Sequence, residues 1–298
     1  MIRCNELTKF FNGTRALKEC SFQIDEPTLT GVIGVNGAGK TTLFKTLAGF
    51  LKPTSGEAAL FGETAFQNIT AAQNVMLIEE GMQFYPGTPL LDLLDSYQRF
   101  YENFDMTLAK GLLEYFNLPF DARYDRLSKG MASTFRLILA LSSRAAVTLL
   151  DEPTTGMDPS VRKDVYELIL KDYVKVPRVI LISSHYLGEM ENILDRILLI
   201  HEGRVLQEGS PDDFQNLFVA LKASPEIIAP IEEKLEVFDG KDFGPGTRQI
   251  VVRREDFDGL HLREDVTDVM DIKSISPEDS FIYLTRRKGG GIHELYDS

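Results

Sequence analysis

The feature that most constrains this chain is a glycine-rich loop between an apolar run and an amphipathic segment. The loop spans residues 34–42, reads GVNGAGKTT, and satisfies the pattern G-x-x-x-x-G-K-[ST]. An apolar run at residues 29–33 precedes it and a helix-like segment follows, so the order is strand, loop and helix. Glycines let the backbone turn at positive φ and bring its N–H groups close to phosphate oxygens. The sequence therefore predicts a phosphate-binding loop at the start of a helix.

The polar residues of this loop have distinct expected tasks. The new helix adds unpaired N–H groups and the positive end of its dipole, both of which favour an anion. Lys40 adds a positive charge for the β- and γ-phosphates of a nucleotide, and Thr41 offers a hydroxyl to Mg²⁺. The residues expected to bind the phosphates are Asn36, Gly37, Ala38, Gly39, Lys40, Thr41 and Thr42.

Two consecutive carboxylates form a second candidate site. Asp151 and Glu152 follow the apolar run of residues 147–150. Polar residues at the carboxyl end of a buried parallel strand lie at the edge of the sheet where ligands bind, which places them beside the phosphate loop. Asp151 is expected to hold Mg²⁺ directly or through water, and Glu152 to polarise the attacking water. A solvated Asp-Glu turn would explain either carboxylate alone, but not the apolar strand and the phosphate loop together.

Composition and charge exclude several other classes of protein. The 298 residues carry a formal charge of −13, which argues against a nucleic-acid partner, because such binding needs a basic surface. Cys4 and Cys20 are expected to be buried thiols, since neither a disulfide framework nor a zinc site is suggested. No stretch reaches the roughly 18 apolar residues of a membrane span, and no signal peptide is visible. We therefore expect a cytoplasmic chain whose membrane-spanning partner, if any, is another polypeptide.

Strand-like and helix-like segments alternate to about residue 215, which is typical of a mostly parallel sheet covered by helices. The expected strands are residues 2–7, 20–24, 29–35, 75–78, 147–150, 179–183 and 197–201. The expected helices are residues 41–48, 90–101, 107–116, 131–143, 160–171 and 186–194. Later segments are short and charged, with a helix expected at 224–237, a strand at 249–253, a helix at 277–284 and a frayed glycine tail at 289–291. We expect a nucleotide-binding domain at residues 1–215 and a small α+β domain at residues 216–298.

Further motifs, over about the first 210 residues, are similar to those of ABC transporter ATP-binding subunits. The signature segment, residues 127–131 with the sequence LSKGM, stands where that family has LSGGQ. Asp158 ends a TGMD sequence that resembles the D-loop, His185 ends an SSH sequence that resembles the switch loop, and Phe11 matches the aromatic position that stacks on adenine. The resemblance implies an α/β P-loop NTPase fold with a mostly parallel sheet, an antiparallel β subdomain and a helical subdomain at about residues 82–145.

The resemblance also implies ATP hydrolysis with Mg²⁺ between two protomers, in a homodimer or a heterodimer. One protomer would bind the nucleotide through its phosphate loop, and the other through Ser128, Lys129, Gly130 and Met131, with Asp158 at the same interface. Glu152 would act as the base and His185 would steady the γ-phosphate. Phe11 would stack on adenine, although a core phenylalanine would leave the same sequence pattern.

Departures from the family pattern point to one of its branches. Glu80 stands where the family usually has glutamine, and a glutamate can still ligate Mg²⁺, while Gln83 is an alternative three positions later. Lys129 replaces a glycine and Met131 replaces a glutamine. With the ending at residues 275–284, which is similar to an SLEDxFL pattern, these features resemble the ATPases of type-2 exporters in Gram-positive bacteria, including the Ytr-type, acetoin-linked system.

The expected function is that of an ATP-hydrolysing subunit that powers a separate integral-membrane permease, with export as the direction, from the inner face of the cell membrane. Other functions stay open: a cytosolic ABC-type ATPase that acts as a scaffold or assembly factor, and a nucleotide-sensing protein without turnover. A kinase or GTPase stays open only if the resemblance of residues 127–131 to the family signature is coincidental. The transported substrate is not encoded here, because the permease would form its path. The carboxy-terminal domain is expected to contact the partner ATPase subunit.

Overall fold

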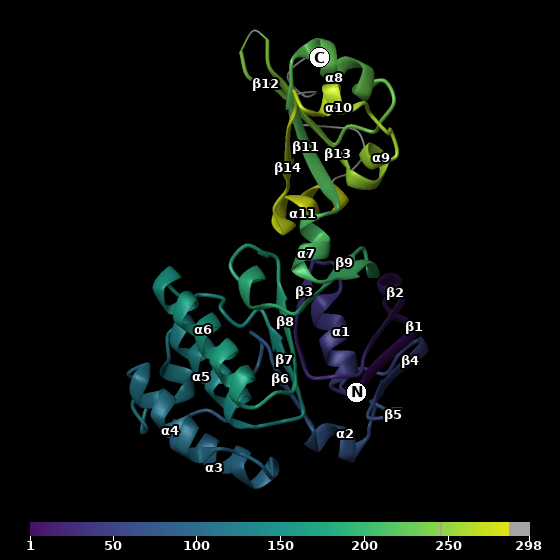
Figure 1. Ribbon diagram of the computed structural model, residues 1–298. Helices are drawn as coiled ribbons and strands as arrows, with labels where there is room; N and C mark the ends of the chain where they lie inside the picture. The colour runs from purple at the N-terminus through teal and green to yellow at the C-terminus, as the bar shows by residue number, and fades with distance from the viewer. Residues whose placement is uncertain (245, 286–298) are drawn as a thin grey trace. The chain divides into compact units, whose positions relative to one another are not determined.

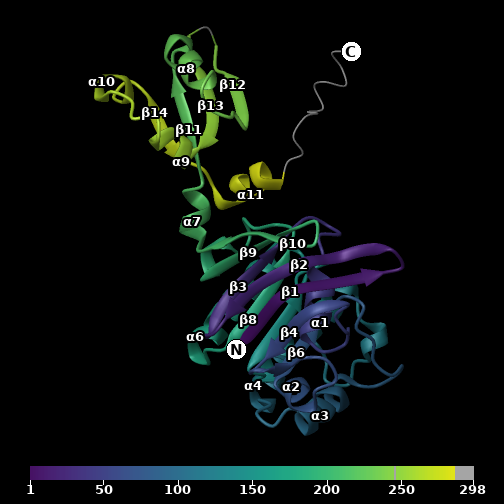
Figure 2. The same cartoon turned by 90° about the vertical axis from the view of Figure 1, so that its right-hand side faces the viewer.

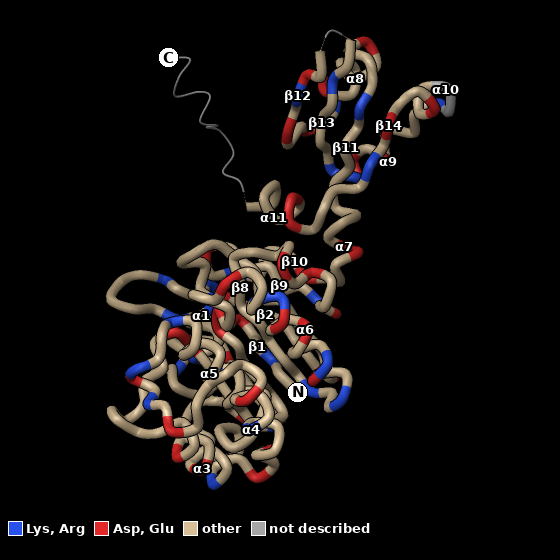
Figure 3. Tube along the Cα trace, turned by 90° about the vertical axis from the view of Figure 1, so that its left-hand side faces the viewer, with Lys and Arg blue, Asp and Glu red and all other residues tan. Residues whose placement is uncertain are grey.

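The apolar runs of the first part of the chain pair into the expected sheet (Figure 1). The structure is a computed structural model that describes residues 1–244 and 246–285, so the glycine tail at 289–291 lies outside the described residues. The backbone divides into two units, Met1–Glu208 and Gly209–Ser298. Figure 3 shows acidic and basic residues interspersed along both units.

A six-stranded sheet forms the centre of the first unit. Its order is β10-β9-β3-β8-β7-β6, and all pairs from β9 to β6 are parallel. The central strands β7 and β8 are buried along their whole length, which explains their unbroken apolar composition. The strands are β3 (Thr28–Ile33), β6 (Val75–Ile78), β7 (Val147–Asp151), β8 (Val179–Ser184), β9 (Arg196–His201) and β10 (Arg204–Gly209).

Helices cover both faces of this sheet, with α1 on one side and α5 and α6 on the other (Figure 1). The helices predicted at residues 41–48, 90–101, 107–116, 131–143 and 160–171 are confirmed within a few residues at each end. The predicted helix at residues 186–194 is wrong: turns and the single 3₁₀ turn η2 (Glu191–Ile193) occupy it. Leu187, Met190 and Leu194 are buried without a helix, and Gly188 lowers helical propensity there. The helices are α1 (Lys40–Leu47), α2 (Ile69–Gln73), α3 (Leu90–Phe100), α4 (Met106–Tyr115), α5 (Lys129–Ser142) and α6 (Pro159–Lys175), with the 3₁₀ turn η1 (Tyr124–Arg126).

An antiparallel sheet of order β2-β1-β4-β5 packs on the other side of α1. Its first hairpin is longer than predicted, because Asn12 and Gly13 both adopt positive φ and make a tight turn between the strands. Cys4 and Cys20 are buried free thiols, as expected, and burial raises the pKa of Cys20 to about 12. The strands are β1 (Ile2–Phe11), β2 (Thr14–Ile24), β4 (Ser55–Leu60) and β5 (Glu63–Thr64).

The second unit is an antiparallel sheet of order β12-β13-β11-β14 with helices between its strands (Figure 2). The chain order is strand, helix, two strands, two short helices and strand, which follows the ferredoxin-like arrangement with its second helix divided in two. The predicted helix at residues 224–237 ends at Glu232, and the strands β11, β12 and β14 were not predicted. The elements are α7 (Pro211–Gln215), β11 (Phe218–Ala223), α8 (Pro225–Glu232), β12 (Asp239–Asp242), β13 (Arg248–Arg253), α9 (Arg254–Asp258), α10 (Glu264–Thr267), β14 (Asp271–Ser274) and α11 (Pro277–Thr285).

Two apolar clusters hold the second unit together. Val219 and Leu221 of β11 pack with Ile228 and Ile231 of α8 on one face of the sheet. Phe218 packs on the opposite face, because successive residues of a strand point to opposite sides. The unit therefore has a core of its own.

Candidate nucleotide-binding and catalytic site

The glycine-rich loop connects β3 to α1 and forms a pocket of about 210 Å³. Gly37 and Gly39 have φ of 83° and 111°, where side chains are strained, and a Cβ on Gly39 would lie 2.6 Å from the Ala16 carbonyl oxygen. The pocket is lined by Ala16, Asn36, Gly37, Ala38, Gly39, Lys40, Thr41, Thr42 and Glu152. All seven predicted phosphate-binding residues thus lie together. Ala16, from β2, was not predicted, because only the fold brings it to the loop.

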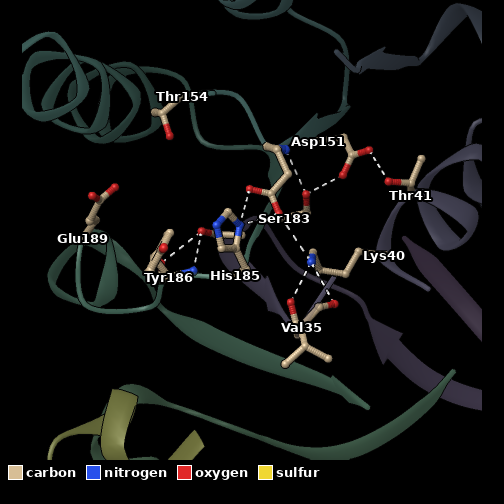
Figure 4. A network of polar contacts seen from close by, with 12 residues as sticks. Val35, Lys40, Thr41, Asp151, Thr154, Ser183, His185, Tyr186 and Glu189 are labelled. Atoms are coloured by element: carbon tan, nitrogen blue, oxygen red, sulfur yellow. Dashed lines mark hydrogen bonds and ion pairs between the residues drawn. The ribbon is translucent and has the colours of Figure 1, made fainter. Parts of the chain in front are cut away.

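Lys40 is the cation of this pocket. Its side chain is almost buried, with the whole residue 6% exposed, and Nζ donates a 2.6 Å hydrogen bond to the Gly34 carbonyl oxygen. Nζ also lies 3.4 Å from Oε1 of Glu152 (Figure 4). A largely desolvated ammonium interacts more strongly with an anion than an exposed one does, which suits a phosphate-binding role.

Asp151 joins the phosphate loop to the sheet. The Thr41 hydroxyl donates a 2.6 Å hydrogen bond to one Asp151 carboxylate oxygen, and Ser183 donates to the other. Asp151 and Ser183 are partners in register on the neighbouring strands β7 and β8. Ser183 Oγ also accepts a 2.9 Å hydrogen bond from the Glu152 backbone N–H. Ser183 was not predicted as a site residue; its place in the SSH sequence was the only available signal.

Glu152 lines the pocket and is in contact with His185, which does not line it. His185 Nδ1 lies 3.0 Å from Oε2 and 3.2 Å from Oε1 of Glu152. Glu152 has a φ of 46°, in the left-handed region that non-glycine residues rarely adopt. Strained backbone of this kind is concentrated at functional sites, where the surroundings enforce it. The Glu152 carboxylate can accept a proton from a water molecule, and the His185 imidazole can hold that carboxylate in position.

Thr41 and Asp151 provide the kind of ligands that Mg²⁺ takes, a hydroxyl oxygen and a carboxylate oxygen on the same edge of the pocket. Among the described residues, no group of three or more His, Cys, Asp or Glu side chains could hold a metal alone. Mg²⁺ commonly binds through one or two carboxylates plus the phosphates of a substrate, so these residues fit it. Glu80 is exposed and does not line the pocket, whereas the neighbouring Glu79 forms an ion pair of 2.7 Å with Lys45.

The signature segment lies outside this pocket. Ser128 caps α5 by accepting a 3.2 Å hydrogen bond from the Met131 N–H, and Ser128, Lys129 and Met131 are exposed. Gly130 packs against the turn after Glu152, where an added Cβ would lie 2.8 Å from the Gly156 carbonyl oxygen. The structure therefore presents the start of α5 on the surface of the first unit.

Asp158 and Phe11 also lie away from the pocket lining. Asp158 is exposed immediately before α6. Phe11 ends β1 and is 41% exposed, with Lys9 Nζ 5.1 Å from its ring centroid. Because its ring is exposed, Phe11 is not a buried core residue, which was the alternative to a role in stacking on adenine.

In the part of the chain that the structure describes, no helix is both long and apolar enough to cross a membrane.

A phosphate loop on a parallel sheet, two carboxylates at the end of the adjoining strand and an exposed signature segment define an ABC-type P-loop ATPase. The sequence profile of the ABC transporter family matches residues 17–155. The ABC transporter ATP-binding protein YtrB of Bacillus subtilis (strain 168) is 29% identical, over 74% of this chain and 76% of its own length. The Nod factor export ATP-binding protein I of Burkholderia lata is 34% identical, over 68% of each chain. The chain belongs to the ATP-binding proteins of ABC transporters, which are ATP hydrolases.

A solved ATP-binding subunit of an ABC transporter has the same fold in the matching region. It superimposes with a TM-score of 0.65 and is 25% identical, covering 72% of this chain and 92% of its own. The predicted α/β P-loop fold and the resemblance to exporter ATPases of the Ytr type are thereby confirmed.

Proposed function

We propose that this chain is the ATPase subunit that powers a separate integral-membrane permease in the export direction, from the cytoplasmic face of the membrane. The observation that carries this proposal is an apolar groove of about 240 Å³ in the first unit, lined by the segment that follows α1 and by residues of α2, β6 and α3. Phe50 and Phe100 on its border are 68% and 52% exposed. Exposed apolar surfaces of this kind are typical of protein–protein interaction sites.

The groove adjoins the segment that leads to the nucleotide pocket. Glu79 lies on its border and forms the ion pair with Lys45 of α1, the helix that begins with the phosphate loop. A permease segment bound in the groove would therefore contact Glu79, which is paired with the helix that begins at the phosphate loop. The name of the Nod factor export relative supports the export direction.

The exposed signature segment supports assembly of two ATPase subunits. Ser128, Lys129, Gly130 and Met131 do not line the pocket of their own chain, yet the helix N-terminus and the hydroxyl there suit an anion. A second copy or a related subunit would present these residues, with Asp158 nearby, to the γ-phosphate. Each nucleotide would then hold two subunits together.

The proposed reaction uses residues of the pocket in distinct roles. Lys40 and the loop N–H groups bind the β- and γ-phosphates, and the ring of Phe11 stacks on adenine. Thr41 and Asp151 would hold Mg²⁺, which supplies charge neutralisation at the phosphates, with Glu80 as a further candidate ligand. Glu152 accepts the proton of the water that attacks the γ-phosphorus, and the bond to the bridging oxygen breaks so that ADP leaves. His185 orients Glu152 and steadies the γ-phosphate.

Replacement of Glu152 by glutamine tests this mechanism. We expect Glu152→Gln to bind ATP as the wild type does, to form a stable dimer in size-exclusion chromatography with ATP and Mg²⁺, and to lose about 10²- to 10⁴-fold in phosphate release. Glu114→Gln, an exposed carboxylate on α4, is the matched control and is expected to hydrolyse normally. Hydrolysis by Glu152→Gln at the wild-type rate would exclude Glu152 as the base.

Membrane association separates the transporter from the scaffold alternative. In cells that produce the chain naturally, we expect it in the membrane fraction, and a Phe50→Ser/Phe100→Ser variant in the soluble fraction. Purified Phe50→Ser/Phe100→Ser protein is expected to bind ATP normally, because neither residue lines the nucleotide pocket. A wild-type chain that stays soluble with and without ATP would favour the scaffold.

A further inference from the structure

Arg136 is a buried cation whose recorded partners are neutral. It lies on α5, five residues beyond the signature segment, and only 7% of the residue is exposed. Its guanidinium donates hydrogen bonds to Ser133 Oγ (2.7 Å), to the Tyr124 hydroxyl (2.8 Å) and to the Glu80 carbonyl oxygen (3.5 Å). No carboxylate within ion-pair distance of this guanidinium is recorded among the residues that the structure describes.

Both hydroxyls pass the hydrogen bonding on to backbone carbonyls. Ser133 Oγ accepts from Arg136 and donates a 2.9 Å hydrogen bond to the Thr155 carbonyl oxygen. The Tyr124 hydroxyl accepts from Arg136 and donates at 3.4 Å to the Met82 carbonyl oxygen. A hydroxyl that accepts one hydrogen bond donates a stronger one in turn, and this cooperativity is greater when the first donor is a buried charge. Arg136 therefore begins two series of hydrogen bonds, which we call the Ser133 arm and the Tyr124 arm after the hydroxyl that each contains.

The arms end in two loops that are distant in sequence. The Tyr124 arm and the direct bond to Glu80 reach the β6–α3 loop (residues 79–89), which borders the proposed permease groove. The Ser133 arm reaches the turn after Glu152, where Gly156 packs against Gly130 of the signature segment. A single side chain thus joins the groove border to the catalytic turn.

Aromatic packing keeps this centre shielded from water on one side. The Phe84 ring lies 4.5 Å from Tyr124 and 6.2 Å from Phe135, measured between ring centroids. Because Phe84 belongs to the β6–α3 loop, a displacement of that loop must move the Tyr124 ring or break its contact. The Tyr124 hydroxyl would then change its distance to Arg136.

We propose that Arg136 is a positioning residue that transmits displacements of the β6–α3 loop to the turn carrying Glu152 and to the signature segment. The inference rests on the proposed function for the roles of the groove and of Glu152. The planar guanidinium suits this task, because its fork holds two hydroxyl acceptors in fixed directions at once. Lysine has no such fork.

A double-substitution cycle tests the connection without a known permease. Tyr124→Phe and Ser133→Ala each remove one hydroxyl, and neither residue lines the nucleotide pocket. We expect each to lower kcat by about 3- to 10-fold, the size of one lost hydrogen bond, with unchanged ATP affinity. If Arg136 connects the arms, the fold loss of kcat in the Tyr124→Phe/Ser133→Ala double variant is clearly smaller than the product of the two single fold losses. Losses that multiply would show two independent contacts and would overturn the proposal.

Arg136→Met and Arg136→Lys provide the background controls. In the Arg136→Met protein, Tyr124→Phe and Ser133→Ala are expected to change kcat by less than about twofold each, because the link is already broken. Arg136→Lys is expected to restore neither kcat nor the coupling. Full rescue by lysine, or a wild-type kcat in Arg136→Met, would contradict the two-armed geometry. If Arg136→Met does not fold, the cycle in the wild-type background still decides.

Hydrogen exchange gives a readout that needs no hydrolysis. We expect Tyr124→Phe to speed amide exchange in the peptide that covers Thr155 and Met157, although Tyr124 has no recorded contact with that turn. The same substitution in Arg136→Met is expected to add nothing. Unchanged exchange at that turn would overturn the inference, whereas normal hydrolysis by Glu152→Gln would overturn only the proposed mechanism.

Discussion

The Thr41 hydroxyl donates a 2.6 Å hydrogen bond to the Asp151 carboxylate, and so connects two motifs that are 110 residues apart in sequence. Both oxygens lie at the edge of the nucleotide pocket, one from the start of α1 and one from the end of β7. The geometry of the proposed Mg²⁺ site therefore depends on the packing of α1 against the sheet.

Thr41→Val tests this pair of oxygens. The substitution removes the hydroxyl with little change in volume, so we expect the Mg²⁺ concentration for half-maximal ATP hydrolysis to rise by about 10-fold or more. Mg²⁺ titrations of phosphate release measure it. Thr46→Val is the matched control, because Thr46 lies on the same helix and its hydroxyl bonds to the Thr42 carbonyl oxygen. An unchanged Mg²⁺ requirement in Thr41→Val would exclude the hydroxyl as a ligand.

Gly130→Ala tests the contact between the signature segment and the turn after Glu152. The added Cβ would lie 2.8 Å from the Gly156 carbonyl oxygen, so one of the two backbones must shift. We expect kcat to fall at least about 10-fold, while the affinity of a fluorescent ATP analogue stays unchanged. Gly111→Ala is the control, because nothing lies within 4 Å of a Cβ at this position in α4. Equal kcat values for the two variants would contradict a catalytic role for this contact.

Asp172→Asn tests a buried ion network. Asp172 accepts from both Arg144 (2.5 Å) and Arg178 (2.7 Å), and all three side chains are largely buried. Removal of the shared carboxylate charge leaves two desolvated guanidinium groups, so we expect the free energy of unfolding to fall by about 3–5 kcal/mol. Urea denaturation measures the change. Glu167→Gln, which breaks an exposed pair with Lys171, is expected to have little effect, and similar losses for both variants would show that burial is unimportant here.

Asp105→Asn tests the pH dependence of stability. The Leu108 backbone N–H, and then Arg144, lower the pKa of Asp105 below its ordinary value. The folded state therefore holds this carboxylate ionised more strongly than the unfolded chain does. Its stabilising contribution is complete above the ordinary carboxyl pKa and is lost as the pH falls through the lowered folded-state pKa.

We accordingly expect Asp105→Asn to have a flatter decline of unfolding free energy than the wild type between about pH 5 and pH 2. Denaturation curves at a series of pH values measure the two slopes. Asp95→Asn, an exposed carboxylate on α3, is the control. Parallel slopes for Asp105→Asn and the wild type would contradict the proposed linkage.

The sequence was sufficient for the phosphate loop and for the strand that ends at Asp151, because both depend on local patterns. Glycines at positive φ, the start of a helix and an apolar run each produce a recognisable sequence pattern within about ten residues. Ser183 lacks such a pattern: its role depends on the register of β8 against β7, which only the assembled sheet defines. Ala16 and Arg136 depend on tertiary contacts in the same way.

The second unit was the hardest part to predict, and its composition explains why. β14 is exposed along its whole length and β12 is almost so, which removes the apolar alternation by which strands are recognised. The helix predicted at residues 224–237 was too long, because the apolar periodicity continues through Leu235 and Val237 after the helix has ended at Glu232. Both side chains instead join the core from the connection to β12.

The left-handed backbone at Glu152 creates a conflict at this position between the stability of the fold and the need for a carboxylate. Glycine would relieve the torsional strain but would remove the carboxylate. The residue with the least backbone strain at this position therefore cannot perform the proposed chemistry. Directed evolution for heat resistance alone should therefore accumulate glycine at position 152 and yield well-folded proteins that bind ATP but do not turn it over.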